Sequence, residues 1–110
     1  MNELFLSKWK SQVKKGTLTF IVLSILKDQE FYGYELIEEV KSHTQIIIAE
    51  GTLYPLMNRL KKEDLVTSKW VEQSSSIPRK YYCLTETGIK TLVQMQDYWK
   101  KLEKSIKKIS

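Results

Sequence analysis

The hydrophobic period of this chain changes twice within 110 residues, and this change constrains the fold more than any other feature of the sequence. Up to about residue 63 the apolar residues recur at spacings of three and four, which is typical of helices. Between Val66 and Leu84 two segments rich in alternating and β-prone residues predict a β-hairpin. From Leu92 onward the helical spacing returns. A chain of this length forms one domain, so helices and hairpin must share one core.

The helical part divides into four predicted segments. An amphipathic helix covers residues 5–13, and a second, more apolar helix begins near Thr17. A third helix begins around Gly33, and a fourth covers about residues 52–63. The run of isoleucines at 46–48 is β-branched and too short for a helix, so it predicts a small strand or an extended connector.

The boundaries between these elements carry their own signals. Residues 28–31 predict a turn, and residues 74–78 predict a polar, flexible hairpin tip. Pro55 fits a helix that starts within the preceding turn, whereas an earlier start makes its ring face the carbonyl of Gly51. Thr85 is a plausible N-cap for the last helix.

The last helix has the clearest periodicity in the chain. Its apolar residues follow a heptad spacing of 3, 4, 3, 4, 3: Leu92, Met95, Trp99, Leu102, Ile106 and Ile109. In a chain with a core of modest size, a helix of this kind is expected to gain stability from a partner chain. The alternative is that the stripe packs on the core of its own chain.

The charge balance indicates an anionic partner. The chain has 18 Lys and Arg against 13 Asp and Glu, a formal charge of +5 and a pI near 9.3. Such an excess suits nucleic acid, a membrane surface or an acidic protein. The apolar residues 17–26 are too few to cross a bilayer, which takes about 20 residues, and charged residues follow them directly. We therefore expect a buried helix there and no membrane partner.

Cys83 and His43 are the only cysteine and histidine. One thiol cannot close an internal disulfide, which favours a cytoplasmic location, and a zinc site needs four ligands. His43 has no predicted catalytic partner, and Cys83 lies in an apolar strand where thiolate formation is disfavoured. We expect no metal, no cofactor and no enzymatic activity.

The element order predicts a mainly α fold with a two-stranded β-wing. The third and fourth helices form a helix-turn-helix, followed by the wing, with an additional helix at each end of the chain. In this arrangement the second helix of the pair enters the major groove of duplex DNA and the wing contacts the flanking backbone. The candidate DNA-binding residues are Thr52, Tyr54, Asn58, Arg59, Lys61, Lys62, Arg79 and Lys80.

Their chemistry divides the candidates by role. Asn58 and Arg59 are of the types that pair with adenine and guanine edges, whereas Tyr54 and the lysines suit phosphates. Simpler alternatives exist: Lys61 and Lys62 can form a solvated face, and Tyr54 can pack partly into the core. Arg79 and Lys80 can contact phosphate or the minor groove, or can protect an edge strand.

Several strings in this order resemble the PadR family of transcriptional regulators. They are Tyr32-Gly33-Tyr34-Glu35-Leu36, Gly51-Thr52-Leu53-Tyr54-Pro55-Leu56, Arg59-Leu60, Leu65, Trp70, Arg79-Lys80-Tyr81-Tyr82, Leu84-Thr85 and Gly88. Together they cover most of residues 18–92. One departure is Ala49, which stands where a small polar helix cap is more usual.

The resemblance implies a winged-helix homodimer that represses transcription from an inverted-repeat operator and is sometimes released by a small apolar or aromatic effector. Residues 1–84 would form the DNA-binding domain with its N-terminal helix, and residues 85–110 the dimerisation helix. The expected interface residues are Phe5, Trp9, Val13, Leu92, Met95, Trp99, Leu102 and Ile106. Trp9 and Trp99 are the candidates for effector binding, although both can simply fill the interface. The alternative function is a winged-helix module that binds protein or RNA without an operator.

Overall fold

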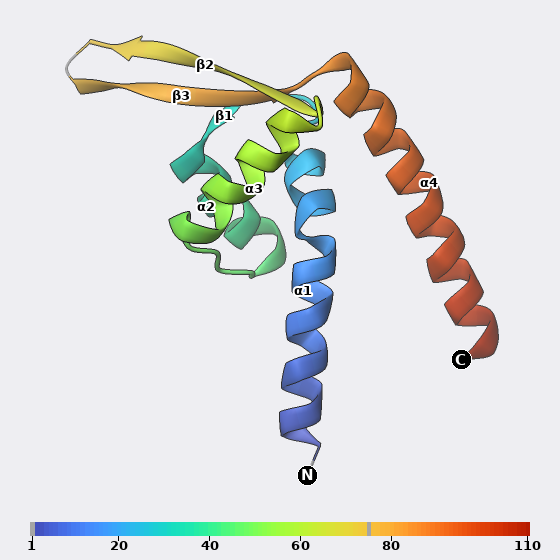
Figure 1. The fold of residues 1–110 in the computed structure, drawn as a ribbon. Coiled ribbons are helices and arrows are strands. Elements are labelled where there is room, and N and C mark those ends of the chain that lie inside the picture. The colour runs from blue at the N-terminus through green and yellow to red at the C-terminus, as the bar shows by residue number, and fades with distance from the viewer. Residues whose placement is uncertain (1, 75) are drawn as a thin grey trace.

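The computed structural model describes residues 2–74 and 76–110, which form a winged-helix fold (Figure 1). Its elements are α1 (Glu3–Ile25), β1 (Phe31–Tyr32), α2 (Gly33–Thr44), α3 (Glu50–Lys62), β2 (Val66–Gln73), β3 (Ser76–Leu84) and α4 (Glu86–Ile109). The antiparallel sheet has the strand order β1-β3-β2. As predicted, α2 and α3 form a helix-turn-helix, β2 and β3 form the wing, and a helix lies at each end.

One prediction that fails concerns the N-terminal region, where α1 is a single helix of 23 residues rather than two. Gly16 lies inside it, with open space around the position of an added Cβ. A glycine in a helix costs about 1 kcal/mol relative to alanine, which flanking residues with good helical propensity can offset. The Thr17 hydroxyl donates to the carbonyl of Val13 at 2.7 Å instead of capping a new helix.

The sheet has one strand more than predicted. Phe31, expected in a turn, pairs with Tyr82, and Tyr32 pairs with Tyr81. The strand is short because Gly33 already begins α2. Phe31 and Tyr82 point toward the helices and are buried in the core. This pairing attaches the start of the helix-turn-helix directly to the root of the wing.

The start of α3 lies two residues earlier than predicted. Ala49 is its N-cap without a side-chain hydrogen bond, and the Ala49 carbonyl accepts from the N–H groups of Thr52 and Leu53, each at 3.0 Å. Pro55 is therefore inside the helix, and its missing N–H leaves the Gly51 carbonyl without its helical donor. Residues 46–48 form an extended connector rather than a strand.

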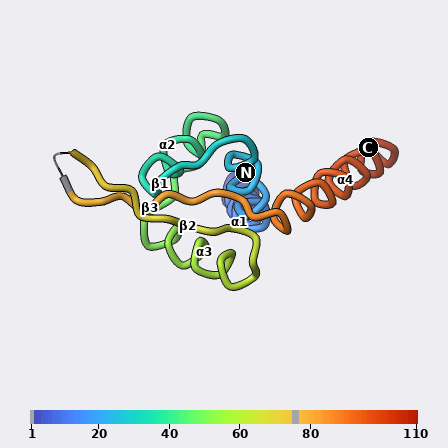
Figure 2. Tube along the Cα trace, turned by 90° about the horizontal axis from the view of Figure 1, so that it is seen from above, coloured from blue at the N-terminus to red at the C-terminus, as the bar shows by residue number. Residues whose placement is uncertain are grey.

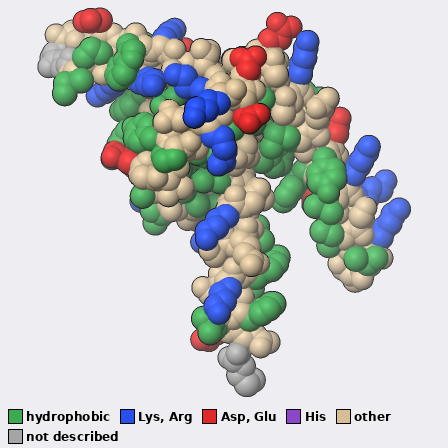
Figure 3. Space-filling view, viewed as in Figure 1, with side chains coloured by type: hydrophobic (Ala, Val, Ile, Leu, Met, Phe, Trp, Pro, Cys, Tyr) green, Lys and Arg blue, Asp and Glu red, His purple; other side chains and the backbone are tan. Residues whose placement is uncertain are grey.

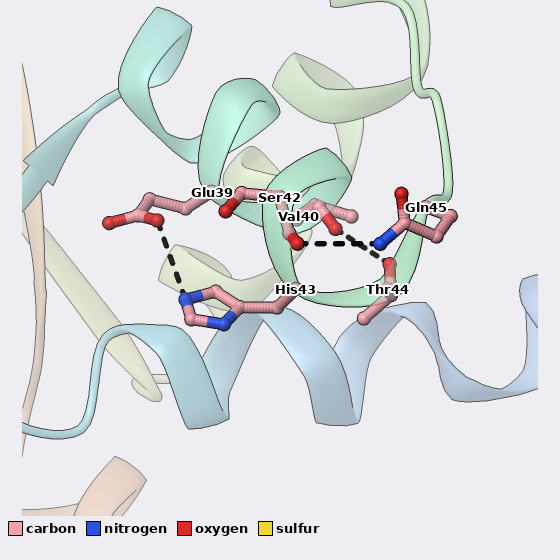
Figure 4. Close-up of polar contacts among 6 residues, drawn as sticks. All are labelled: Glu39, Val40, Ser42, His43, Thr44 and Gln45. Atoms are coloured by element: carbon pink, nitrogen blue, oxygen red, sulfur yellow. Dashed lines mark hydrogen bonds and ion pairs between the residues drawn. The ribbon is translucent and has the colours of Figure 1, made fainter.

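Local polar contacts end α2 (Figure 4). His43 Nε2 lies 3.4 Å from Glu39 Oε2 one turn earlier, on the surface. The Thr44 hydroxyl donates to the Val40 carbonyl at 2.6 Å and accepts from the N–H of Ile46 at 3.2 Å. Gln45 adopts the left-handed conformation with φ 64°. The helix thus stops at Thr44 and the chain turns toward α3.

The wing extends away from the body on the side opposite α4, as the view from above shows (Figure 2). Trp70 pairs with Lys80 and Val71 with Arg79, after which the register shifts before Gln73 pairs with Ser76. Pro78 lies opposite this irregularity, where its missing N–H is tolerated. Ile77 and Pro78 thus belong to β3 rather than to the predicted tip, of which Ser75 lies outside the described residues.

The core lies between the helices and one face of the sheet. It consists of Val22, Leu23, Leu26, Phe31, Leu36, Val40, Ile48, Leu53, Leu56, Met57, Leu60, Val66, Tyr82 and Leu92. The radius of gyration is 16.0 Å, against about 13 Å for a compact domain of this length. The difference arises because the first half of α1, the end of α4 and the wing project from the core (Figure 1).

A tight junction joins the end of α3, the wing and α4. The N–H of Leu65 donates to the Leu60 carbonyl at 2.9 Å, and the Leu65 carbonyl accepts from the N–H of Thr85 at 3.1 Å. The Thr85 hydroxyl accepts from the N–H of Gly88 at 2.9 Å, so Thr85 is the predicted N-cap. Gly88 packs so closely on Leu65 that a Cβ would overlap the Leu65 carbonyl oxygen. Only glycine fits here.

Candidate nucleic-acid interface

The outer face of α3 carries the six predicted DNA-binding residues of this helix. Its inner face, formed by Leu53, Leu56, Met57 and Leu60, is buried in the core. Thr52, Tyr54, Asn58, Arg59, Lys61 and Lys62 are all exposed, as the helical spacing predicted. The helix therefore presents donors and acceptors on a narrow cylinder of the width that the major groove accepts.

The outer face of α3 is bordered by a cleft on each side. On the side of the wing, Tyr54 and Asn58 line a cleft of about 500 Å³ together with the start of α2 and with Lys80. On the side of α1, Arg59 lines a smaller cleft of about 290 Å³ together with Lys15. The polar residues of α3 thus divide between two flanks.

Tyr54 is positioned by the start of α2. Its ring packs on Gly33, where an added Cβ would lie 2.7 Å from one ring carbon and 2.8 Å from another. Burial, followed by the negative charge of Glu50, raises the pKa of the Tyr54 phenol. The phenol therefore stays protonated at neutral pH and can donate a hydrogen bond. Tyr54 is thus partly packed, as the simpler alternative predicted, and still partly exposed, and its contact with phosphate stays a prediction.

The two predicted wing cations lie on opposite faces of the ribbon. Arg79 shares a face with Tyr81, and its guanidinium lies 4.5 Å from the centre of the Tyr32 ring. Successive residues of a strand alternate between its two faces, so Lys80 lies on the same face as Tyr82, which is the face toward α3. Lys80 therefore points to the side of the sheet on which α3 lies, and Arg79 lines the same cleft from beside the Tyr32 ring.

Lys and Arg side chains gather at the root of the wing and over α3, and continue onto α1 (Figure 3). Among residues 2–74 and 76–110, four pairs come within ion-pair distance: His43 with Glu39, Lys69 with Glu30, Lys90 with Glu86, and Lys107 with Glu103. None involves the cations of α3, Arg79 or Lys80. These charges are therefore free to meet an external anion.

Six of the predicted dimer residues are exposed, whereas Leu92 is buried and Met95 is half-buried against the core. Phe5, Trp9 and Val13 lie on the exposed half of α1, and Trp99, Leu102 and Ile106 lie on the exposed half of α4. Leu92 is only 1% exposed because the first turns of α4 pack on the core, so it belongs to the core of its own chain. The predicted seam therefore begins later on α4 than expected.

An apolar cavity of about 470 Å³ lies between α1 and α4. Trp99 and Phe20 line it with ring centroids 5.6 Å apart, and Met95 and Leu102 complete its α4 side. Hydrophobic side chains follow the facing sides of the two helices (Figure 3). Trp9, the other predicted effector residue, is not among the residues that line this cavity.

Within residues 2–74 and 76–110, no cluster of three or more His, Cys, Asp and Glu side chains could hold a metal ion. Over the same described residues, no helix is both long and apolar enough to cross a bilayer.

The sequence interpretation missed two residues of this surface. Lys15 was assigned no role, because only the packing of α1 beside α3 brings it to the cleft that Arg59 also lines. Strand alternation predicted that Trp70 shares a face with Val66, but Trp70 was assigned no role in the interface. In the structure Trp70 is 67% exposed and lies beside Lys80.

Comparison with known proteins agrees with this arrangement. The model of the "Transcriptional regulator PadR-like family" matches residues 22–94. A PadR family transcriptional regulator from Eggerthella lenta is 36% identical, with a TM-score of 0.87 over 97% of this chain and 93% of that one. The transcriptional regulator YqjI of Escherichia coli is 30% identical over 84% of this chain, which spans 44% of YqjI. The fold also matches Bacillus subtilis PadR, solved in complex with operator DNA, with a TM-score of 0.67 and 23% identity over 73% of this chain and 45% of that one.

A helix-turn-helix followed by a β-wing, with a basic and exposed second helix, defines a winged-helix protein of the DNA-binding class. The match over residues 22–94 shows that this chain belongs to the PadR-like family. It is therefore a transcriptional regulator and not an enzyme.

Proposed function

We propose that this regulator is a homodimeric repressor that binds an inverted-repeat operator with α3 in the major groove. The observation that carries the proposal is the outer face of α3, which is exposed and polar and makes no ion pair with any residue that the structure describes. Asn58 lies near the middle of this face, where a bidentate contact to adenine is geometrically available. Arg59 and Lys62 flank it and can reach base edges or phosphates.

The unpartnered apolar residues of α1 and α4 support a second subunit. Trp99 is 42% exposed and Ile106 is 51% exposed, although both continue the stripe that begins in the core. Exposed aromatic and aliphatic side chains in a continuous stripe mark an interaction surface. A partner helix seated there would cover them and space two copies of α3 about 34 Å apart, one turn of DNA.

The cavity between α1 and α4 supports the further proposal of a flat apolar effector. Its walls are aromatic and aliphatic, and its volume of about 470 Å³ lies in the range of small-molecule sites. Such an effector would change DNA affinity only by binding one arrangement of α4 more tightly than another. Trp99 lies in the wall, so its emission would report binding.

The test is fluorescence anisotropy with a labelled duplex from the region upstream of the protein's own gene. A scrambled duplex of equal length serves as the control, and both are titrated at several salt concentrations. We expect preference for the upstream duplex and saturation at two subunits per duplex. Equal, weak binding to both would contradict operator recognition.

Competition separates this proposal from an RNA-binding module. A-form RNA has a major groove too narrow for a helix, so unlabelled RNA duplex should displace the DNA poorly. Displacement by RNA duplex at concentrations equal to DNA would favour the alternative function.

A further inference from the structure

Lys80 lines the wing-side cleft from β3, and Lys61 lies on α3 beside this cleft. Tyr54, Asn58 and Lys61 occupy positions i, i+4 and i+7, so they follow one side of α3. Tyr54 and Asn58 line this cleft together with Lys80 from β3. Lys61 therefore continues the row of α3 residues that faces the underside of the wing.

The two ammonium groups are close enough to affect each other. Burial, followed by the positive charge of Lys61 and a side-chain contact with Lys61, lowers the pKa of Lys80. Neither lysine belongs to the ion pairs of residues 2–74 and 76–110, and the side chains that line the cleft include no carboxylate. Two like charges held together without a counter-charge repel each other, and an anion between them removes the repulsion.

Aromatic rings hold Lys80 in this position. Its Nζ lies 5.7 Å from the centre of the Trp70 ring and 6.0 Å from that of Tyr82. A cation near an aromatic face is attracted by the ring quadrupole, and Trp gives the strongest attraction. Tyr82 is buried, and Trp70 pairs with Lys80 across the strands, so both rings lie on the same face of the wing as Lys80. The ammonium is thereby held toward α3 rather than left to move freely in solvent.

The position of the pair identifies the anion. With α3 in the major groove, the angle between α3 and the wing is where one DNA strand passes. A backbone phosphate has a single negative charge and two free oxygens, and each oxygen can accept from one ammonium. We propose that Lys61 and Lys80 hold one and the same DNA phosphate between them, so that the strand joins the recognition helix to the wing. This inference rests on the proposed function.

Salt dependence measures the number of phosphates that the pair neutralises. The logarithm of the binding constant falls with the logarithm of salt concentration by about 0.9 for each neutralised phosphate. If the lysines share one phosphate, Lys61→Gln and Lys80→Gln each leave the other lysine on it, so the slope stays nearly unchanged. In the double variant the slope should fall by about 0.9 per subunit. Its binding relative to the wild type should therefore be about eightfold weaker per subunit at 0.1 M salt than at 1 M salt.

The matched control is Lys69→Gln. Lys69 carries the same charge on the same wing, but it lies on the other face and pairs with Glu30 at 3.3 Å. It should leave the slope unchanged in both the wild-type and the double-variant background. Circular dichroism of each variant verifies the fold.

A loss of about 0.9 in each single variant and about 1.8 in the double would overturn the shared contact, because each lysine would then neutralise its own phosphate. If the salt slope is unchanged in all variants, the two lysines do not contact DNA, and the proposed function still stands. Absence of duplex binding by the wild-type chain at low salt would overturn both. A scan with single methylphosphonate linkages adds a second readout. One linkage should weaken the wild type and both single variants, and should have no further effect on the double variant.

Discussion

Substitution of Gly88 by alanine should destabilise the protein more than any other glycine-to-alanine change in the chain. The added Cβ would overlap the carbonyl oxygen of Leu65, with the carbonyl carbon at 3.0 Å and the Cα at 3.3 Å. All three are backbone atoms at the junction of α3 and β2, so no side chain can rotate to relieve the contact. The first turn of α4 must therefore move away from Leu65.

The size of the effect follows from the contacts that this movement disturbs. Forced insertion of one carbon into a packed site costs about 1–3 kcal/mol. The hydrogen bonds from Thr85 N–H to Leu65 and from Gly88 N–H to Thr85 would lengthen, at about 0.5–1.5 kcal/mol each. We therefore expect a loss of about 2–6 kcal/mol in the free energy of unfolding, against a total of about 5–15 kcal/mol. The melting temperature should fall by at least about 8 °C.

Urea unfolding followed by circular dichroism, at one fixed protein concentration, measures this loss, since a dimer's stability depends on concentration. Gly51→Ala is the matched control, because nothing lies within 4 Å of a Cβ there and the substitution should not destabilise. If the free energy of unfolding of Gly88→Ala lies within about 0.5 kcal/mol of the wild-type value, the close approach to Leu65 does not position α4, and the reasoning is refuted.

Four further outcomes are expected. Asn58→Ala should weaken binding to the preferred duplex by about 1–3 kcal/mol while binding to a scrambled duplex changes little, as anisotropy would show. Lys15→Gln should weaken both duplexes alike and lower the salt slope by about 0.9 per subunit, because its cleft with Arg59 suits a phosphate. Trp99→Ala should weaken dimerisation in sedimentation equilibrium, and an unchanged dimer at micromolar concentration would place the interface elsewhere. Burial, followed by the charge of Tyr54, raises the pKa of the Tyr82 phenol in the folded state. The stability that this raised pKa contributes is complete below about pH 10 and is lost as the pH rises further. The wild type should therefore lose more stability above about pH 10 than Tyr82→Phe does, as urea unfolding at each pH would show.

Local pattern was enough to predict most of the fold. The buried face of α3, the wing strands and the Thr85 cap follow from spacing and residue type within a few positions of each other. The division of α1 into two helices was wrong because Gly16 was treated as a boundary. Its cost is about 1 kcal/mol, which is too small to end a helix whose second half packs on the core.

Features that depend on distant residues could not be predicted in this way. A strand as short as β1 has no period of its own, and its partner lies about fifty residues further along the chain. The approach of Lys61 to Lys80, and the cleft that Lys15 and Arg59 both line, depend on how the helices and the wing pack. The opposite orientations of Arg79 and Lys80 were available from strand alternation, although the sequence interpretation treated the two as a pair.

Because the wing connects directly to α4, a small rotation at this connection moves the far end of the helix by a large distance. Thr85 alone separates β3 from α4, and its hydroxyl donates to the Asp64 carbonyl at 2.5 Å while Gly88 seats the first turn on Leu65. The helix is about 36 Å long at 1.5 Å per residue over its 24 residues. A rotation of 10° at Thr85 would move the far end of α4 by about 6 Å, by the same geometry. Conversely, a partner that binds the far end of α4 fixes the direction of the wing and of the recognition helix, because no flexible linker separates them from α4.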